Sequence, residues 1–119
     1  MTLDKLAIQP VYAAELHQTL TVDELKQFAH TTAINNQIDP TLFLGIAECE
    51  SHWQPTVQSK FYYKGYRERS FGIFQIHLTA HHDVSYEQAI DPYFNIQWAA
   101  AHFQTPWDDW KTCYSEVLK

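Results

Sequence analysis

The sequence predicts a small, mainly α-helical domain that carries one long irregular segment. Three observations lead to this prediction. Apolar residues recur every three or four positions in several segments, and most of these segments begin with residues typical of helix N-termini. Between residues 58 and 76, the chain is aromatic, polar and interrupted by glycine, which favours irregular structure with a short hairpin. A chain of 119 residues is expected to form one domain with one modest core.

The first predicted helix runs from Val22 to about Asn36 and is expected to pack on the core. Thr21 and Glu24 have the spacing of a capping box, in which each side chain accepts a hydrogen bond from the other residue's backbone N–H. Apolar residues then follow at positions 22, 25, 28, 29 and 33. Residues 1–20 show no clear period, and we expect an N-terminal extension that packs on the body, with residues 21–119 as the main domain.

The second predicted helix runs from Pro40 to about Ser51 or His52. Asp39 is a favourable N-cap, and proline suits the first helical position. The apolar positions and the cysteine that continue this helix are Leu42, Phe43, Ile46, Ala47 and Cys49.

Three further helices are predicted after the irregular segment. Ser85 is expected to cap a short helix that extends through Ala89. Asp91 and Pro92 repeat the favourable start for a helix that reaches about Phe103, and residues 107–118 are predicted to form a closing helix. A small helical domain rarely keeps nearly twenty irregular residues without a functional reason, so we expect residues 58–76 to contribute to a site.

Glu50, in the last turn of the second predicted helix, is the candidate acid and base. The apolar residues at positions 43, 46 and 47 share its helix face. Burial against that face and the negative end of the helix both disfavour a carboxylate, so we expect a raised pKa, as a general acid requires. A surface glutamate on a frayed helix end is the alternative. Glu48 is expected on the opposite flank in solvent, although the sequence leaves the reverse assignment open.

The net charge of −6 disfavours nonspecific binding to nucleic acid or to anionic membranes. No apolar stretch is long enough to suggest a membrane span. The first residues lack the basic and apolar order of a signal peptide, so we expect either a signal removed earlier or another export route. Cys49 and Cys113 could form a disulfide, which would contribute roughly 4 kcal/mol to stability, or they could remain two buried thiols. Their spacing in the sequence does not decide between these alternatives.

Residues 47–55 (AECESHWQP), Ser59 and residues 70–76 (SFGIFQI) resemble the soluble lytic transglycosylase family, which belongs to the lysozyme-like superfamily. The pattern of that family is a helix ending in Glu-Ser, a later serine, and Gly-x-x-Gln followed by an apolar residue. Residues 91–100 match its next block, and residues 107–114 are similar to the ending of small members that carry a cysteine beside the catalytic glutamate. The resemblance covers about residues 38–115 and implies a lysozyme-like helical domain whose irregular segment lines a substrate cleft.

The resemblance implies roles for individual residues. Glu50 matches the single catalytic acid/base, and Ser51 matches a neighbour that helps to hold the substrate or the glutamate. Ser59 and Gln75 match polar positions of the cleft, and Gly72 matches a turn at which the backbone approaches sugar. Asn95 is expected to hold structure rather than sugar. Cys49 and Cys113 resemble the disulfide of small members. The family's Tyr-Asn-Ala-Gly segment is missing, so the tyrosine that supports Glu50 is one of Tyr62, Tyr63 and Tyr114.

The implied activity is cleavage of the β-1,4 bond between N-acetylmuramic acid and N-acetylglucosamine in peptidoglycan, with formation of 1,6-anhydro-N-acetylmuramic acid and without a cofactor. Hydrolysis by a muramidase is the first alternative. Ser70 stands where animal-type lysozymes carry an aspartate, but Glu68 or Asp83 could position a water molecule. A non-catalytic glycan-binding module is the alternative from a different class.

His77, His81 and His82 form a pattern whose spacing also occurs in zinc sites. No glutamate follows as in metalloproteases, so we expect no metal; His77 is a candidate contact to sugar hydroxyls. The expected partner is the glycan strand of peptidoglycan, bound by a monomer, with no nucleic acid. The resemblance implies a periplasmic, cell-wall-associated or secreted protein, and a phage-encoded lysis protein also fits.

Overall fold

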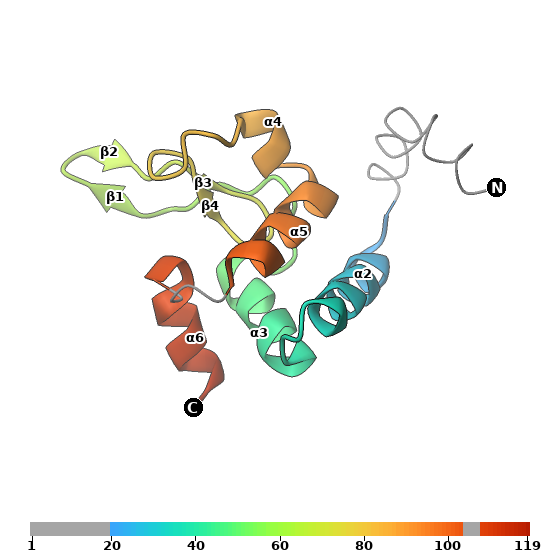
Figure 1. The fold of residues 1–119 in the computed structure, drawn as a ribbon. Coiled ribbons are helices and arrows are strands. Elements are labelled where there is room, and N and C mark those ends of the chain that lie inside the picture. The colour runs from blue at the N-terminus through green and yellow to red at the C-terminus, as the bar shows by residue number, and fades with distance from the viewer. Residues whose placement is uncertain (1–19, 104–107) are drawn as a thin grey trace, which may run out of the picture.

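Two helices that lie side by side form the base of the fold: α2 (Val22–Asn35) and α3 (Pro40–Ser51). The structure is a computed structural model that describes residues 20–103 and 108–119. Three other helices complete the α-helical part of the described chain (Figure 1): α4 (Tyr86–Ala89), α5 (Pro92–His102) and α6 (Lys111–Val117). Helix α5 packs against α2 and α4, and α6 packs against α3. The mainly α-helical class is therefore confirmed.

The ends of the helices follow the capping residues. The Thr21 hydroxyl accepts a hydrogen bond from the Glu24 N–H at 3.1 Å, and the Glu24 carboxylate accepts one from the Thr21 N–H at 2.8 Å. Asp39 accepts from the Thr41 N–H at 3.0 Å. The closing helix differs from the expectation, because a 3-10 turn, η1 (Asp108–Trp110), precedes α6. The predicted extension 1–20 lies almost entirely outside the described residues, as does the start of the closing helix at residue 107.

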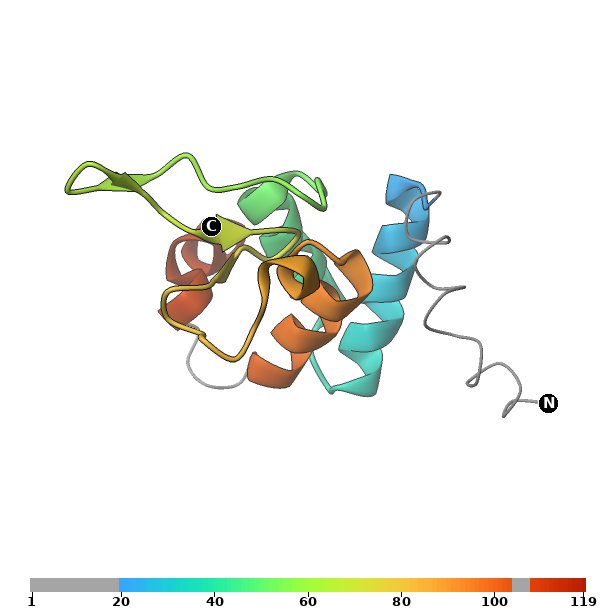
Figure 2. The same cartoon turned by 90° about the horizontal axis from the view of Figure 1, so that it is seen from above.

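The segment between residues 58 and 76 contains two hairpins, where one was expected. Strand β1 (Tyr62–Tyr63) pairs antiparallel with β2 (Tyr66–Arg67), and β3 (Ser70–Phe71) pairs antiparallel with β4 (Ile76–His77). Figures 1 and 2 agree that the β1–β2 hairpin projects away from the helices. The β3–β4 hairpin instead lies against them, and it holds one wall of the site described below.

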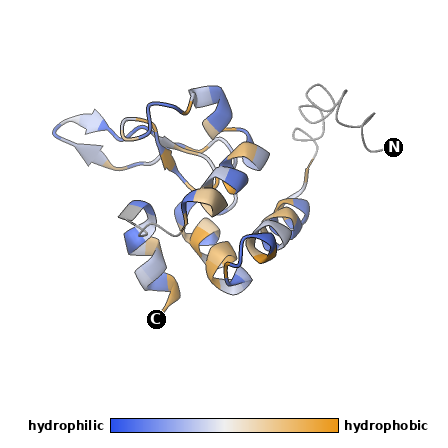
Figure 3. Ribbon diagram, viewed as in Figure 1, coloured by the Kyte–Doolittle hydropathy of each residue, from blue (hydrophilic) through white to orange (hydrophobic). Residues whose placement is uncertain are grey.

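The core joins the helices to the second hairpin. Figure 3 shows hydrophobic colours on α3 and α5, and hydrophilic to neutral colours on the β1–β2 hairpin. Asn95 of α5 is 0 % exposed, and its side chain accepts from the Phe74 N–H at 2.7 Å and donates to the carbonyls of Phe71 and Ala89. Buried polar groups need such partners. Asn95 therefore holds the hairpin on the helices, which confirms the structural role expected for it.

A disulfide between Cys49 and Cys113 ties α3 to α6, with the two Cα atoms 5.7 Å apart. The pairing implied by the family resemblance is therefore present. The bridge closes a loop with a sequence separation of 64, for which the chain-entropy model gives a contribution of about 4 kcal/mol. Because Cys49 directly precedes Glu50, this bond also anchors the end of the helix that carries the candidate acid.

Among the described helices, none combines the length and apolar character of a membrane span.

Candidate active site

Glu50 lies in the last turn of α3 beside a cavity of about 370 Å³. The walls of the cavity come from the end of α3, from the chain that follows it and from the hairpin region. Three other residues expected at the site line this cavity, namely Ser51, Ser59 and Gln75. The carboxylate of Glu68 lines it as well. The fold thus brings together polar groups that are up to 25 positions apart in the sequence, from position 50 to position 75.

The pKa of Glu50 is raised to about 8, mainly because burial removes water from its carboxylate. The negative charges of Glu68 and Asp109 raise the pKa further. Phe43, Ile46 and Ala47, which share the helix face with Glu50, are fully buried. The raised pKa expected from that apolar face is therefore present, and Glu50 carries a proton at neutral pH.

Glu48 has the opposite environment. Its carboxylate is exposed and lies 2.9 Å from Nδ1 of His52. Of the two glutamates near the end of α3, Glu48 is therefore the solvated one, as expected.

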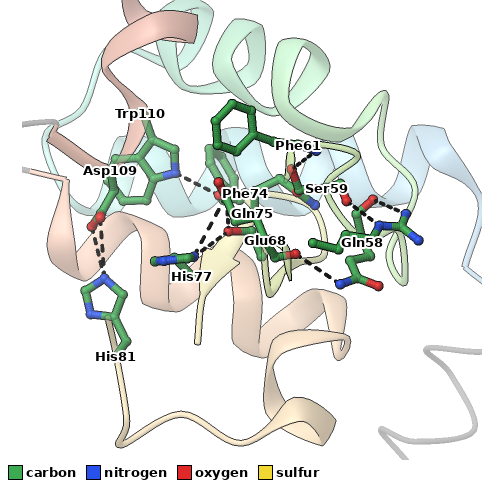
Figure 4. A network of polar contacts seen from close by, with 12 residues as sticks. Gln58, Ser59, Phe61, Glu68, Phe74, Gln75, His77, His81, Asp109 and Trp110 are labelled. Carbon is green, nitrogen blue, oxygen red and sulfur yellow. Dashed lines mark hydrogen bonds and ion pairs between the residues drawn. The ribbon is translucent and has the colours of Figure 1, made fainter. Parts of the chain in front are cut away.

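Glu68 is held in place by two other residues, as Figure 4 shows. The Ser70 hydroxyl donates a hydrogen bond to the Glu68 carboxylate, and Nδ1 of His77 lies 3.0 Å from the same hydroxyl oxygen. Since the hydroxyl hydrogen is directed at Glu68, Nδ1 of His77 acts as the donor to Ser70. The Nδ1 atom is also 3.9 Å from the Glu68 carboxylate. These contacts fix a negative charge at the edge of the cavity that contains Glu50.

The chain turns sharply directly after Glu50. His52 and Trp53 both adopt left-handed backbone conformations, with φ of 53° and 63°. Ser51 is 4 % exposed; its hydroxyl donates to the carbonyl of Ala47 and accepts from the Trp53 N–H at 3.1 Å. Two consecutive non-glycine residues in this conformation are strained, and strain of this kind is typical of functional sites. The hydroxyl of Ser51 therefore stabilises the turn that positions Glu50.

Ser59 and Gln75 also line the cavity of Glu50. The Ser59 hydroxyl accepts from the Phe61 N–H at 3.1 Å, and the Ser59 N–H donates to the carbonyl of Ser70. The amide nitrogen of Gln75 donates to the carbonyls of Val57 and Gly72, both at 3.0 Å. Both side chains are thus oriented by backbone partners, and this preorganises two polar groups in the cavity that contains the glutamate.

Gly72 is not among the residues that line the cavity of Glu50, and the expected approach of its backbone to sugar stays a prediction. Packing within the protein gives a separate reason for a glycine here. A Cβ atom at this position would lie 2.3 Å from the carbonyl oxygen of Ala89 and 2.4 Å from Nδ2 of Asn95. In addition, its φ of +87° is a conformation that residues with a side chain rarely adopt. Gly72 is therefore required for the contact between the hairpin and the helices.

The remaining candidates lie elsewhere. Tyr62 and Tyr63 are exposed on the projecting hairpin, and Tyr63 and His77 line a second cavity beside it. Tyr114, on α6, is half-buried and packs against the core. None of these three tyrosines is among the residues that line the cavity of Glu50. The identity of a tyrosine that supports the glutamate therefore stays a prediction.

The three histidines of the zinc-like pattern face different partners. His77 contacts Ser70, and Nε2 of His81 lies 3.3 Å from the Asp109 carboxylate (Figure 4). Nε2 of His82 lies 2.6 Å from the carbonyl oxygen of Thr79. Within residues 20–103 and 108–119, no group of three or more His, Cys, Asp or Glu side chains has the arrangement of a metal site.

Asp109 is the functional neighbour that sequence reasoning missed. It belongs to η1, far along the chain from Glu50, yet its charge contributes to the raised pKa of that residue. No motif marks it, because an aspartate in a segment without a period gives no local signal. The nearest feature of the sequence that could have indicated Asp109 is the following residue, Trp110. Its buried indole donates a hydrogen bond to the carbonyl of Phe74 at 2.8 Å and holds η1 in place.

Comparison with known families gives one match. The model of the family described as the transglycosylase SLT domain matches residues 27–118. No curated protein and no solved structure gives a match. The matched range contains the cavity of Glu50, both hairpins and both cysteines of the disulfide.

Proposed function

The chain belongs to the transglycosylase SLT domain family, whose members act on peptidoglycan, and we propose that it is a lytic transglycosylase with Glu50 as its acid and base. The observation that carries this proposal is the carboxyl group of Glu50, which lines a cavity and has its pKa raised to about 8, so that it holds a proton at neutral pH. A general acid must hold a proton at the working pH, and a surface glutamate does not. We also propose residues 21–119 as the catalytic domain and residues 1–20 as an extension of it.

The reaction begins when protonated Glu50 donates its proton to the glycosidic oxygen between N-acetylmuramic acid and N-acetylglucosamine. The bond from that oxygen to the muramic sugar breaks, and the acetamido group of that sugar stabilises the positive charge that develops. Glu50, now a carboxylate, removes the proton from the 6-hydroxyl, whose oxygen closes the 1,6-anhydro ring. The proton returns to Glu50 and no water is consumed. One carboxyl group with a raised pKa serves both steps.

The neighbouring groups have supporting roles in this proposal. Gln75 and Ser59 are available to bind the sugar's polar substituents in the cavity of Glu50, because backbone partners already orient them. Ser51 acts on the glutamate through the turn that it stabilises. Preorganised polar groups of this kind lower the cost of binding a sugar in one orientation.

Hydrolysis by a muramidase is the second candidate, and one observation favours it. Glu68 lines the cavity of Glu50 and is held there by Ser70 and His77. A second carboxylate in the same cavity could activate a water molecule. Asp83, the other residue considered for that role, is exposed and does not line the cavity.

The products distinguish the two reactions. Purified peptidoglycan is treated with the native chain, and the soluble fragments are analysed by mass spectrometry. Anhydro-muropeptides, lighter than the hydrolysis products by one water molecule, are expected. In Glu50→Gln they should decrease by a factor of about 10³, since general acid–base catalysis contributes about 10²–10⁴-fold. Hydrated reducing ends would identify a muramidase, and the absence of any product that depends on Glu50 would favour a glycan-binding module.

Glu48→Gln is the matched control for that experiment. The same chemical change is made two positions earlier, at an exposed carboxylate paired with His52. The control variant should keep nearly full activity. Thermal melting of both variants shows whether a loss of activity reflects a loss of fold.

We further propose that the protein acts as a monomer outside the cytoplasm, as a periplasmic, wall-associated or secreted enzyme or as a phage lysis protein. The support is the substrate, because peptidoglycan lies outside the cytoplasmic membrane. Size-exclusion chromatography of the full chain tests the oligomeric state.

A further inference from the structure

The projecting hairpin concentrates positive charge in an acidic protein. The chain has 8 Lys and Arg residues and a net charge of −6. Half of these cations fall between positions 60 and 69, namely Lys60, Lys64, Arg67 and Arg69. Glu68 is the single acidic residue in the same stretch. This segment therefore has a local charge opposite to that of the whole molecule.

These cations have no acidic partner in the part of the chain that the structure describes. Nε of Arg67 donates to the carbonyl of Ser59 at 2.8 Å, and the ammonium of Lys64 lies 5.4 Å from the centre of the Tyr63 ring. The ion pairs among the described residues all lie elsewhere or involve histidine. Because no carboxylate neutralises them, these side chains are available to an external anion.

The same segment exposes aromatic rings. Tyr66 is 80 % exposed, Tyr63 63 % and Phe61 57 %. Together with three of the four cations they line a cavity of about 620 Å³, here called the hairpin groove: Phe61, Tyr63, Lys64, Tyr66, Arg67 and Arg69, with Glu68, His77 and Thr79 as its other lining residues. Large exposed aromatic side chains grouped around a cavity are typical of binding surfaces. The groove therefore offers apolar faces and positive charges to one ligand.

The groove adjoins the cavity of Glu50. Glu68 lines both cavities. Lys60 lines the cavity of Glu50, while the next residue, Phe61, lines the groove. Figure 4 shows Phe61, Ser59 and Glu68 close together at this junction. A polymer bound at Glu50 would therefore present its side branches to the groove.

We propose that the hairpin groove binds the anionic peptide stem of the peptidoglycan strand whose glycosidic bond lies at Glu50. This inference rests on the proposed function. Sugar rings of the strand are neutral and give the unpaired cations nothing to neutralise, whereas the stem peptides carry free carboxylates. Arg69 and Lys64 pair with these carboxylates, and the aromatic rings pack against the apolar parts of the peptide. The enzyme accordingly prefers strands that carry stems over stripped strands.

The test compares two polymers, using the full chain. One is peptidoglycan with its stems, and the other is the same glycan after an amidase has removed them, which leaves one carboxylate on the lactyl group of each muramic sugar in place of the several carboxylates of the stem. The variant Lys64→Gln/Arg69→Gln removes two groove cations and leaves Arg67, which supports the backbone of the segment. The control Lys111→Gln/Lys119→Gln removes two exposed cations that line neither cavity. For each protein, the ratio of kcat/KM on stem-bearing strands to kcat/KM on stripped strands is measured.

In the groove variant we expect this ratio to fall about five- to tenfold, the size expected when two exposed ion pairs are lost, while the control keeps the native ratio. Raising the salt concentration should lower the native ratio in the same direction. An equal ratio in the two variants, or no preference in the native chain, would overturn the proposal. The same holds if binding to phosphatidylglycerol vesicles depends on Arg69 without any preference for stems, because the occupant would then be a lipid surface.

Binding is measured separately, so that failure of the groove and failure of the proposed function can be told apart. The Glu50→Gln chain, with and without the groove substitutions, is co-sedimented with each polymer. A native chain that cleaves neither polymer would refute the proposed function. The ratio of the dissociation constants would still decide the groove, since it is expected to shift by the same five- to tenfold factor.

Discussion

Glu50 and Glu68 share one cavity, and their charges are coupled. Burial is the main cause of the raised pKa of Glu50, and Glu68 is the next. Glu68 is itself oriented by Ser70, so its charge stays beside the cavity. The proton that the proposed reaction requires therefore depends on a second carboxylate that need not touch the substrate.

Replacing Glu68 by glutamine should shift the pH dependence of activity. The protonated form of Glu50 is the active form, so kcat/KM should fall as the pH rises past about 8. Removing the negative charge of Glu68 makes ionisation of Glu50 easier and lowers its pKa. The alkaline limb of the profile should therefore move to lower pH in Glu68→Gln, whereas Glu48→Gln should leave it in place. Complete loss of activity at every pH in folded Glu68→Gln would instead identify Glu68 as a catalytic carboxylate of a muramidase.

The β3–β4 hairpin is the element that brings Gln75 and Glu68 to the end of α3. Its attachment depends on the side chain of Asn95 and on the missing side chain of Gly72. The projecting hairpin depends on its turn instead. Lys64 and Gly65 both have positive φ, of 51° and 85°, as the tight turns of two-residue hairpins require.

Gly72→Ala should destabilise the protein by about 3 kcal/mol, because a strained φ is combined with a Cβ atom 2.3 Å from the carbonyl oxygen of Ala89. Gly65→Ala is the matched control. Its φ of +85° carries the same conformational cost, of about 1 kcal/mol, but its Cβ would meet nothing within 4 Å. Thermal melting should show a fall of roughly 10 °C for Gly72→Ala and a clearly smaller one for Gly65→Ala. Equal losses in the two variants would show that the close contact of Gly72 with Ala89 of α4 does not matter.

The stability of the whole molecule should reflect the protonation of Glu50. Its pKa is raised from 4.5 to about 8 on folding, so the native state binds the extra proton between these two pH values. The stabilisation is fully present below pH 4.5 and is lost as the pH rises through about 8, because the buried carboxyl must then ionise. In Glu50→Gln the side chain cannot ionise, so the variant does not lose this stability as the pH rises.

The melting temperature of Glu50→Gln, relative to that of the native chain, should therefore increase as the pH rises from 5 to 9. An increase of roughly 5 °C or more is expected over this interval, since each 1 kcal/mol corresponds to about 4 °C in a domain of this size. Glu48→Gln should show no such trend. A difference that is independent of pH would mean that the pKa of Glu50 is not raised.

Much of this protein can be predicted from its sequence alone, because the relevant interactions are local. The capping residues Thr21, Asp39 and Ser85 and the apolar period locate the helices to within about two residues of the observed ends. The apolar face of α3 predicts the raised pKa of Glu50, since helix geometry by itself sets which residues share that face. The resemblance to a known family supplies the disulfide and the polar positions of the cleft.

The tertiary structure alone decides how the irregular segment is arranged. The turn between β3 and β4 lacks the two-residue sequence typical of hairpins, so this second hairpin could not be expected; its place depends on long-range contacts from Asn95 and Trp110. These contacts bring Glu68 into the cavity of Glu50, leave Tyr62 and Tyr63 outside that cavity and pack Gly72 against Ala89 and Asn95. Local sequence determines helices because their hydrogen bonds span only four residues. A site built from distant segments depends on packing that no single stretch of sequence contains.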